Sequence, residues 1–355
     1  MKRKDVLSFL SLNAAFERAP VSDLTSDRRI VIFSDLHMGD GGKADDFLAN
    51  GQMFSQVLSQ YYYPHDYELI LNGDVEDLQR FRMDSIARQW EGVYSVFERF
   101  LNAGRLYRIV GNHDMKLIDF NDFDTPLHEA LRLRYGQDDQ TLFVVHGHQT
   151  RQMYAERNAG IDFILRYVAK PLRISNRSVS HDSKRKLKVE RRVYNFARDM
   201  KILTIIGHTH RPLFESLSKL DTIKFEIETL CREYPEAEGA RRREVEERIE
   251  ALKSELSALY EEPRFHAPTG SLYNENLLVP CMFNSGAVIG SRGMTGIEVS
   301  GGEIRLVYWF DRLRSQTYLR YRNHQAEALQ GTDFHRVVVQ RDSLDYIFSR
   351  IKLLT

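Results

Sequence analysis

Acidic, imidazole and amide side chains follow five short apolar segments of this chain, shortly after each segment ends. The segments are 30–34, 69–71, 109–110, 143–145 and 205–206. The side chains are Asp35, His37, Asp74, Asn112, His113, His146, His208 and His210. Carboxylate, imidazole and amide ligands without a thiolate are typical of manganese, iron, zinc or nickel sites rather than of structural cysteine-type zinc sites. The pattern therefore predicts a divalent metal site.

The number of candidate ligands favours two metal ions over one. A tetrahedral metal takes four ligands, whereas two ions ~3.5–4 Å apart share a bridging carboxylate and need more. The metal-ligand candidates are Asp35, His37, Asp74, Asn112, His146, His208 and His210. His146 and His148 compete for one of these roles, and His146 is favoured because it comes first after its apolar segment. Glycines at 73, 111, 147 and 207 allow sharp turns close to the metals.

The elements that must position these side chains alternate between short strands and helices. Strands are predicted over 29–34, 67–71, 106–110, 141–145 and 202–206, and helices over 45–62 and 84–102. Short apolar runs that alternate with helices predict an α/β sheet buried on both faces. Because sites in such sheets form beyond the carboxyl ends of the strands, the candidate ligands are expected to converge.

A hairpin is predicted near the end of the chain. The apolar stretches 294–299 and 304–310 flank Ser300, Gly301 and Gly302, which is a turn signal. This pattern predicts a second, antiparallel sheet.

Two segments look inserted. Residues 151–192 hold twelve Lys and Arg against four Asp and Glu, and 220–262 hold thirteen acids against seven bases. In the second segment, apolar residues at four-three spacing predict a coiled-coil seam. They are Val245, Ile249, Leu252, Leu256 and Leu259. A helical hairpin that turns near 235–239 buries this seam either within itself or across a homodimer.

Taken in order, these motifs resemble those of the calcineurin-like metallophosphoesterase superfamily. They stand as Asp35-Leu36-His37, Gly73-Asp74-Val75-Glu76-Asp77, Gly111-Asn112-His113-Asp114, His146-Gly147-His148 and Gly207-His208-Thr209-His210. The resemblance covers 30–212 and 281–310, and it implies an α/β fold with a metallophosphoesterase-type β-sandwich flanked by helices. The expected parts are an N-terminal helix or arm (1–28), the main domain (29–219 and 263–322), a basic helical cap within it (151–200), the inserted helical hairpin (220–262) and a C-terminal helical extension (323–355).

The resemblance also implies roles for the site residues. One metal would be held by Asp35, His37, Asp74 and His210, and the second by Asp74, Asn112, His146 and His208. Two divalent ions, manganese first and iron, zinc or nickel as alternatives, would activate a shared water that attacks phosphorus. His113 would protonate the leaving group, with Asp77 holding its imidazole. Asp114 is either an orienting residue behind the ligands or a helix cap.

The implied activity is hydrolysis of a phosphomonoester or phosphodiester, with Arg80, Arg151 and Arg211 as candidate substrate-binding residues. Serine/threonine protein phosphatases carry an arginine where this chain has Leu78, which disfavours that reading. The basic cap resembles that of the bacterial UDP-2,3-diacylglucosamine pyrophosphatase group. The third motif of that group, however, resembles G-N-R-D, whereas this chain has His113 in place of the arginine. A non-catalytic scaffold on the same fold is the alternative of another class.

Composition limits the partners. Fifty basic and fifty acidic residues give zero formal charge, which disfavours nucleic acid as a partner and leaves a phosphorylated small molecule, lipid-linked molecule or protein as substrate. Two cysteines cannot build a disulfide framework, so a cytoplasmic location is expected. No uncharged apolar run reaches the ~18 residues of a membrane-spanning helix.

Overall fold

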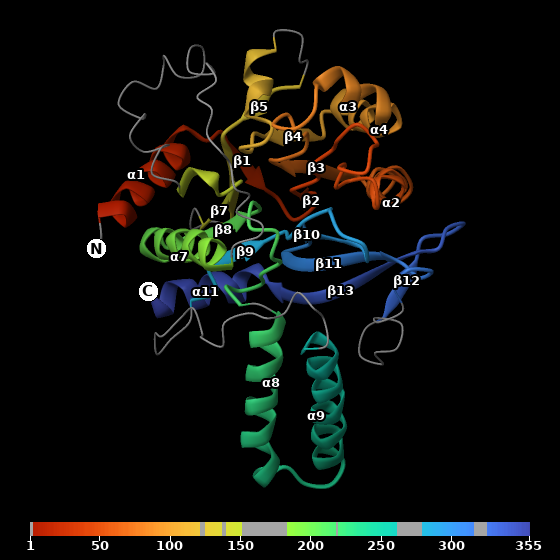
Figure 1. Cartoon of the computed structure of the whole chain (residues 1–355). Helices are drawn as coiled ribbons and strands as arrows, with labels where there is room; N and C mark the ends of the chain where they lie inside the picture. Colours follow the sequence, from red (N-terminus) through yellow and green to blue (C-terminus); the bar gives the residue numbers. More distant parts are fainter. Residues whose placement is uncertain are drawn as a thin grey trace.

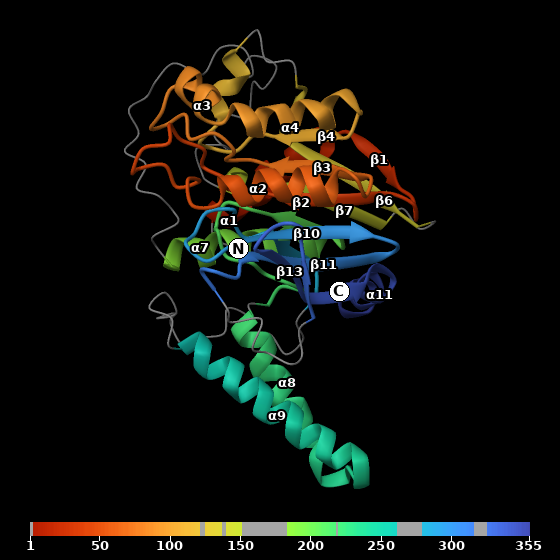
Figure 2. The same cartoon turned by 90° about the vertical axis from the view of Figure 1, so that its right-hand side faces the viewer.

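Two β-sheets form the body of the chain in the computed structural model (Figure 1), which describes residues 3–120, 125–136, 140–150, 183–217, 219–260, 279–315 and 325–355. Helices α2, α3 and α4 lie on one side of the sheets, and α1, α7 and α11 lie on another. Helices α8 and α9 project away from this body (Figure 2). The predicted sandwich flanked by helices is confirmed.

The larger sheet has eight strands in the order β12-β13-β11-β10-β2-β3-β4-β5. Their bounds are β2 Arg29–Phe33, β3 Tyr67–Asn72, β4 Leu106–Ile109, β5 Leu127–His128, β10 Met294–Ser300, β11 Glu303–Asp311, β12 Ala326–Ala328 and β13 Phe334–Ser343. Strands β2 to β5 run parallel, and β10 joins β2 antiparallel. The carboxyl ends of β2, β3 and β4 therefore meet at one edge of the sheet.

The smaller sheet has five strands in the order β1-β6-β7-β8-β9. Their bounds are β1 Val21–Leu24, β6 Ala130–Tyr135, β7 Gln140–Val145, β8 Leu203–Ile206 and β9 Met282–Asn284. Strands β7, β8 and β9 are parallel neighbours. The expectation of a separate antiparallel sheet over 281–310 is wrong, because β10 and β11 extend the larger sheet and β9 joins the smaller one. The turn itself is confirmed, with Gly301 and Gly302 at φ 59° and 74°.

Helices cover the outer faces of both sheets, so the chain has four layers. The α-helices of the body are α1 Arg3–Arg18, α2 Gly51–Val57, α3 Met83–Gln89, α4 Glu91–Asn102, α7 Ser183–Met200 and α11 Leu344–Leu354. Shorter turns are the π-helix η1 Leu58–Tyr62 and the 3₁₀-helices η2 Met115–Asp119 and η3 His148–Thr150. On the smaller sheet, Phe143 of β7 contacts Phe16 of α1 and Phe196 of α7, with ring centres 5.3 and 6.0 Å away.

Strand β2 is buried on both faces, as its apolar run predicts. Ile30 and Ile32 face the core between the sheets, whereas Val31 and Phe33 face the helices. The ring of Phe33 lies 5.3 Å from that of Phe54 in α2, edge to face. Burial on both faces fixes the register of β2 in the sheet, and this register sets the position of the loop that follows.

The inserted segment 220–262 contains two helices that lie side by side. They are α8 Lys219–Glu233 and α9 Gly239–Tyr260, joined through the 3₁₀-turn η6 Tyr234–Glu236. Ile223 and Leu230 of α8 pack against Val245 and Leu252 of α9. Ion pairs such as that of Arg248 with Glu226, 2.5 Å apart, flank this seam. The described part of the seam is thus buried within one chain, so it does not require a second copy.

The end of the chain differs from the expectation of a helical extension over 323–355. Strands β12 and β13 come first, and only Leu344–Leu354 is helical. Strand β13 pairs with β11 along nine residues, and Val337 is fully buried. The three successive valines at 337–339 are the β-branched signal that the sequence analysis did not weigh.

The predicted cap, 151–200, falls within the described residues only from 183 onward. There helix α7 packs on the smaller sheet through Val193, Phe196 and Ala197. Arg151 lies outside the described residues. Among the helices that are described, none combines the length and the apolar character that crossing a bilayer requires.

Candidate metal centre

The loops after five strands bring the predicted ligand types to one place. Three overlapping groups have ligand atoms that all lie within 4.8 Å of one another. The groups are Asp35, His37 and His210; His37, Asp74 and His113; and Asp74, His146 and His208. They are built from the ends of β2, β3 and β4 in the larger sheet and of β7 and β8 in the smaller one. The site therefore lies where the two sheets meet.

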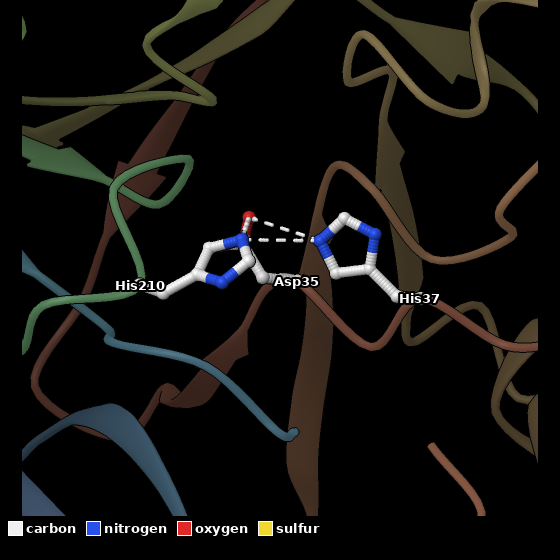
Figure 3. Close-up of side chains that lie close together, drawn as sticks. All are labelled: Asp35, His37 and His210. Carbon is white, nitrogen blue, oxygen red and sulfur yellow. Dashed lines mark hydrogen bonds and ion pairs between the residues drawn. The ribbon is translucent and has the colours of Figure 1, made fainter. Parts of the chain in front are cut away.

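The first group joins the two sheets directly (Figure 3). The Nε2 atom of His210 lies 3.1 Å from Oδ1 of Asp35 and 3.1 Å from Nε2 of His37. The Nε2 atom of His37 is 3.9 Å from Asp35 and 3.9 Å from Oδ2 of Asp74. The Nε2 atoms of the two imidazoles thus face each other, and the Asp35 carboxylate lies beside that of His210, as Figure 3 shows.

The third group, Asp74, His146 and His208, is centred on Asp74. The Nε2 atom of His146 lies 3.2 Å from Oδ2 of Asp74. The other ring nitrogen of His146 lies 2.7 Å from the carbonyl oxygen of Asn72, to which it donates, and this fixes Nε2 toward the site. His148 is buried beside these rings but belongs to none of the three groups found among the described residues.

His113 and Asp77 form a hydrogen-bonded pair at the edge of the site. The Nδ1 atom of His113 lies 2.9 Å from Oδ1 of Asp77, and the backbone N–H of His113 donates to Oδ1 of Asp74 at 2.7 Å. Burial lowers the pKa of His113, but Asp77 and Asp74 outweigh it, and the pKa lies above its ordinary value. His113 is also within reach of His37 and Asp74, in the second group.

Asn112 brings a buried acceptor that lacks a hydrogen bond. Its Oδ1 atom is shielded from solvent and has no hydrogen-bond partner. A buried amide oxygen left in this way costs free energy, about 1–3 kcal/mol, unless a ligand satisfies it. Together with the carboxylates and imidazoles, this oxygen fits a divalent cation.

Five of the predicted ligands have a left-handed backbone. The φ angles are 55° for Asp35, 49° for His37, 54° for Asp74, 63° for His208 and 54° for His210. This region is sparsely populated by residues other than glycine, and strain of this kind persists only where the surrounding structure imposes it. Such strain concentrates at functional sites, and here it points the side chains of three different loops to one centre.

Two glycines allow these loops to approach closely. A Cβ atom on Gly111 would lie 2.2 Å from Oδ1 of Asp74, and one on Gly207 would lie 2.6 Å from Oδ2 of Asp35. Neither position has room for any side chain. Both glycines were expected from the sequence to serve this purpose.

The loops of the larger sheet are fastened to each other by their own backbones. Asp35 N–H donates to Gly73 O and His37 N–H donates to Asp74 O, both at 3.0 Å. The carboxylate of Asp114 accepts from the N–H groups of Gly111 and Val75, at 2.6 and 2.8 Å. Asp114 therefore ties the loop after β4 to the loop after β3, which favours the orienting role over that of a helix cap.

The charges of the site are strongly coupled. Burial raises the pKa of Asp74, but the neighbouring imidazoles, His146 first, hold it well below its ordinary value. Burial lowers the pKa of His146, but Asp74 more than reverses this and raises it to about 10. Burial and the charge of His210 lower the pKa of His37 to about 4. Ionised Asp74 and neutral His37 are the forms that bind metals.

The described candidate arginines are both engaged in ion pairs. Arg80 pairs with Asp77 and, at 2.5 Å, with Asp46, and its side chain is 41% exposed. Arg211 pairs with Glu190 of α7 at 2.5 Å.

Sequence reasoning missed several residues that surround the ligands. Ser34 donates to Asp35 at 2.6 Å, and Asn284 of β9 donates to the carbonyl oxygen of Gly207 at 3.2 Å. Glu190 lies behind the loop after β8. Ser34 could have been suspected from its place beside Asp35, whereas no local signal marks Asn284 or Glu190, which are far away in the sequence.

The sequence of this chain matches one family of known proteins. The sequence model of one family, calcineurin-like phosphoesterase, matches residues 28–216, just over half of the chain. No curated protein matches. Among solved structures, a single mutant of Vps29 from Entamoeba histolytica is similar at 11% identity with a TM-score of 0.32, over 80% of this chain and 92% of that one. On the strength of the family match, this chain belongs to the calcineurin-like phosphoesterase family.

Proposed function

We propose that this chain is a two-metal phosphoesterase that hydrolyses a phosphomonoester or a phosphodiester. The observation that carries the proposal is the set of three overlapping ligand groups, which share His37 and Asp74. Overlap of this kind suits two ions that share a carboxylate rather than one ion in a closed site. Membership of the family supports the same reaction class.

The proposed ligands divide into two sets. Asp35, His37, Asp74 and His210 would hold one ion, and Asp74, Asn112, His146 and His208 would hold the other. The first and third groups of close ligand atoms support this division, and the buried, unsatisfied oxygen of Asn112 supports its place in the second set. Manganese is the proposed metal, with iron, zinc or nickel as alternatives that favour the same donors.

Two divalent ions would supply Lewis-acid chemistry, activating a water and neutralising charge on the phosphoryl group. The side chains of the chain supply orientation and a proton. Asp77 accepts from Nδ1 of His113 and so leaves Nε2 to donate to the departing oxygen. The N–H of His113 also holds one oxygen of Asp74, which couples the proton donor to the proposed bridging carboxylate.

The proposed substrate is a phosphoester whose departing oxygen can reach His113. Leu78 is buried at 3% exposure where protein phosphatases carry an arginine, and Arg80 is held by Asp77 and Asp46 nearby. This arrangement supports a phosphoester other than a phosphoprotein. The alternative of a UDP-2,3-diacylglucosamine pyrophosphatase depends on the 151–182 part of the cap, which is outside the described residues.

Because Cys231 and Cys281 form no disulfide, we also propose a reducing, cytoplasmic location.

A substrate panel with the full chain tests the proposal. The protein is stripped with EDTA, reloaded with Mn²⁺, and assayed with p-nitrophenyl phosphate, bis(p-nitrophenyl) phosphate, UDP-diacylglucosamine, a phosphoserine peptide and single-stranded DNA. Metal-dependent turnover of one of the small esters is expected. Full metal loading without turnover of any of them would favour the scaffold alternative.

His113→Ala separates the proton donor from a metal ligand. Removal of a general acid costs about 10²–10⁴-fold in kcat, whereas the metal content is expected to stay at about two per chain. His65→Ala is the matched control, because His65 is an exposed histidine whose ring nitrogen bonds Tyr61 O in its own turn. Loss of a metal from His113→Ala would instead make His113 a ligand.

A further inference from the structure

Helix α7 places a buried carboxylate behind the loop that carries His208 and His210. Glu190 is fully buried, although it belongs to a helix whose neighbouring residues Arg185, Lys188 and Arg191 are exposed. A buried carboxylate is costly unless its oxygens are paired, so its position calls for an explanation. The explanation lies in the two residues on either side of His210.

Both oxygens of Glu190 are used to hold that loop. The hydroxyl of Thr209 donates to Oε1 at 2.8 Å. The guanidinium of Arg211 donates to Oε2 at 2.5 Å through Nη2 and to Oε1 at 3.2 Å through Nε. Glu190 therefore grips the residue before His210 and the residue after it.

Thr209 is fixed from a second direction. The amide of Asn284 in β9 donates to the Thr209 hydroxyl at 2.8 Å and to the carbonyl oxygen of Gly207 at 3.2 Å. Thr209 and Asn284 are both fully buried. Because the hydroxyl accepts from Asn284 and donates to Glu190, its single proton and its orientation are both determined.

The loop needs such support because its backbone is strained. His208 and His210 both have positive φ, at 63° and 54°, with Thr209 between them. Conformations of this kind persist only where contacts over-determine them. In the larger sheet the backbone N–H groups of Asp35 and His37 bond to the neighbouring loop. Here the backbone bond is that of Gly207 N–H to His146 O at 3.1 Å, and the contacts of Thr209 come from side chains of α7 and β9.

We propose that Glu190 is a positioning residue of the metal centre, acting through Thr209 and Arg211 to hold His208 and His210 in place; this rests on the proposed two-metal function. Arg211 then serves as the counter-charge that makes the buried carboxylate tolerable, rather than as a substrate-binding residue. Partners of this kind behind the ligands typically change metal affinity by about 10–100-fold.

Metal affinity, measured by isothermal titration of Mn²⁺ into the stripped full chain, tests this without any substrate. Glu190→Gln and Thr209→Val are each expected to weaken Mn²⁺ binding by about 10–100-fold. Thr209→Ser keeps the hydroxyl and is expected to stay within about 3-fold of the original chain, because the interaction rather than the packing is what matters. Equal loss in Thr209→Val and Thr209→Ser, or unchanged affinity in both Glu190→Gln and Thr209→Val, would overturn the inference.

A matched control shows whether a lost buried ion pair alone explains the effect. Glu298 is fully buried and pairs with Arg336 at 2.5 Å in the larger sheet, outside the three ligand groups. Glu298→Gln is expected to lower the melting temperature about as much as Glu190→Gln and to leave Mn²⁺ affinity unchanged. An equal fall in affinity in Glu298→Gln would assign the effect to general destabilisation and overturn the inference.

Arg211→Met distinguishes its two roles. As a counter-charge, its loss is expected to weaken Mn²⁺ binding about as much as Glu190→Gln does. A raised KM with unchanged Mn²⁺ affinity would make Arg211 a substrate-binding residue and would contradict the inference. If the original chain itself bound no Mn²⁺, the proposed function would fail instead, so the two failures are distinguishable.

Discussion

The two halves of the metal centre are built differently. In the larger sheet, the loops that carry Asp35, His37 and Asp74 bond to each other through backbone groups, and Asp114 fastens them from within the motif Gly111–Asp114. In the smaller sheet, the Gly207 N–H donates to His146 O at 3.1 Å and so joins the loops after β8 and β7. The residues around His208 and His210 are held in addition by side chains of α7 and β9. The first half is braced mainly by its own motifs, whereas the second half also depends on the surrounding fold.

This difference shows that local motifs can identify metal ligands without identifying all the residues that support them. A motif specifies the ligands and the turn. The backbone hydrogen bonds between the loops after β2 and β3 also require these two strands to be neighbours in the correct register. Around His208 and His210, side chains from α7 and β9 supply hydrogen bonds beyond those of the backbone.

Asp74→Asn removes the group that both halves share, and we expect the largest effect. Loss of the shared charge is expected to lower both Mn²⁺ affinity and phosphoesterase turnover by more than about 100-fold, beyond the range for partners behind the ligands. Metal analysis and a chromogenic phosphoester assay measure the two. Asp66→Asn is the matched control, because Asp66 also has a positive φ of 57° but has a side chain that is 90% exposed. Retained turnover in Asp74→Asn would remove it from the bridging role.

Gly111→Ala tests the tight packing of the first half. The new methyl group would lie 2.2 Å from Oδ1 and 2.3 Å from the backbone N of Asp74, so a loop must move. We expect loss of at least one Mn²⁺ per chain in metal analysis and a fall of about 1–3 kcal/mol in the free energy of unfolding. Gly92→Ala, in α4 with nothing within 4 Å of the new group, is expected to keep full metal content. Unchanged metal content in Gly111→Ala would show that the loops yield easily.

Asp114→Asn weakens the brace of the first half without touching a ligand. Asparagine keeps one acceptor oxygen and turns a donor toward an N–H group that Asp114 now satisfies. An unsatisfied buried group costs about 1–3 kcal/mol, which we expect to see as a lower free energy of unfolding in urea, together with a fall of about 10-fold in Mn²⁺ affinity. If Asp114→Asn weakened affinity far less than Glu190→Gln, the backbone ladder alone would suffice to hold the first half.

Ser34→Ala disturbs the link between the halves, and we expect the smallest effect. The Ser34 hydroxyl lies 2.6 Å from Asp35 Oδ2 and 2.7 Å from the hydroxyl of Ser285, which follows β9. Asp35 keeps the N–H of His208 as a donor at 2.9 Å. The expected loss is therefore about 1 kcal/mol in the free energy of unfolding, with Mn²⁺ affinity lowered by less than about 10-fold. A larger loss of affinity would make Ser34 a main support of Asp35.

The sequence predicted what is local in this molecule. Apolar runs placed β2, β3, β4, β7 and β8, and the polar residues after them converge as expected because parallel strands end at one edge. The helix expected over 84–102 is broken at Trp90, and β12 and β13 take the place of an expected helix. The second miss reflects the pairing of β13 with β11, a strand outside that segment. The roles of Glu190 and Asn284 could not be predicted from the sequence either, because the tertiary fold determines their partners.

Anomalous X-ray scattering at the manganese edge, from crystals of the metal-loaded full chain, tests whether Asp74 joins two metal ions. Two anomalous peaks are expected, both in contact with Asp74, one also next to His210 and the other also next to His146. A single peak, or two peaks of which Asp74 touches only one, would contradict this expectation.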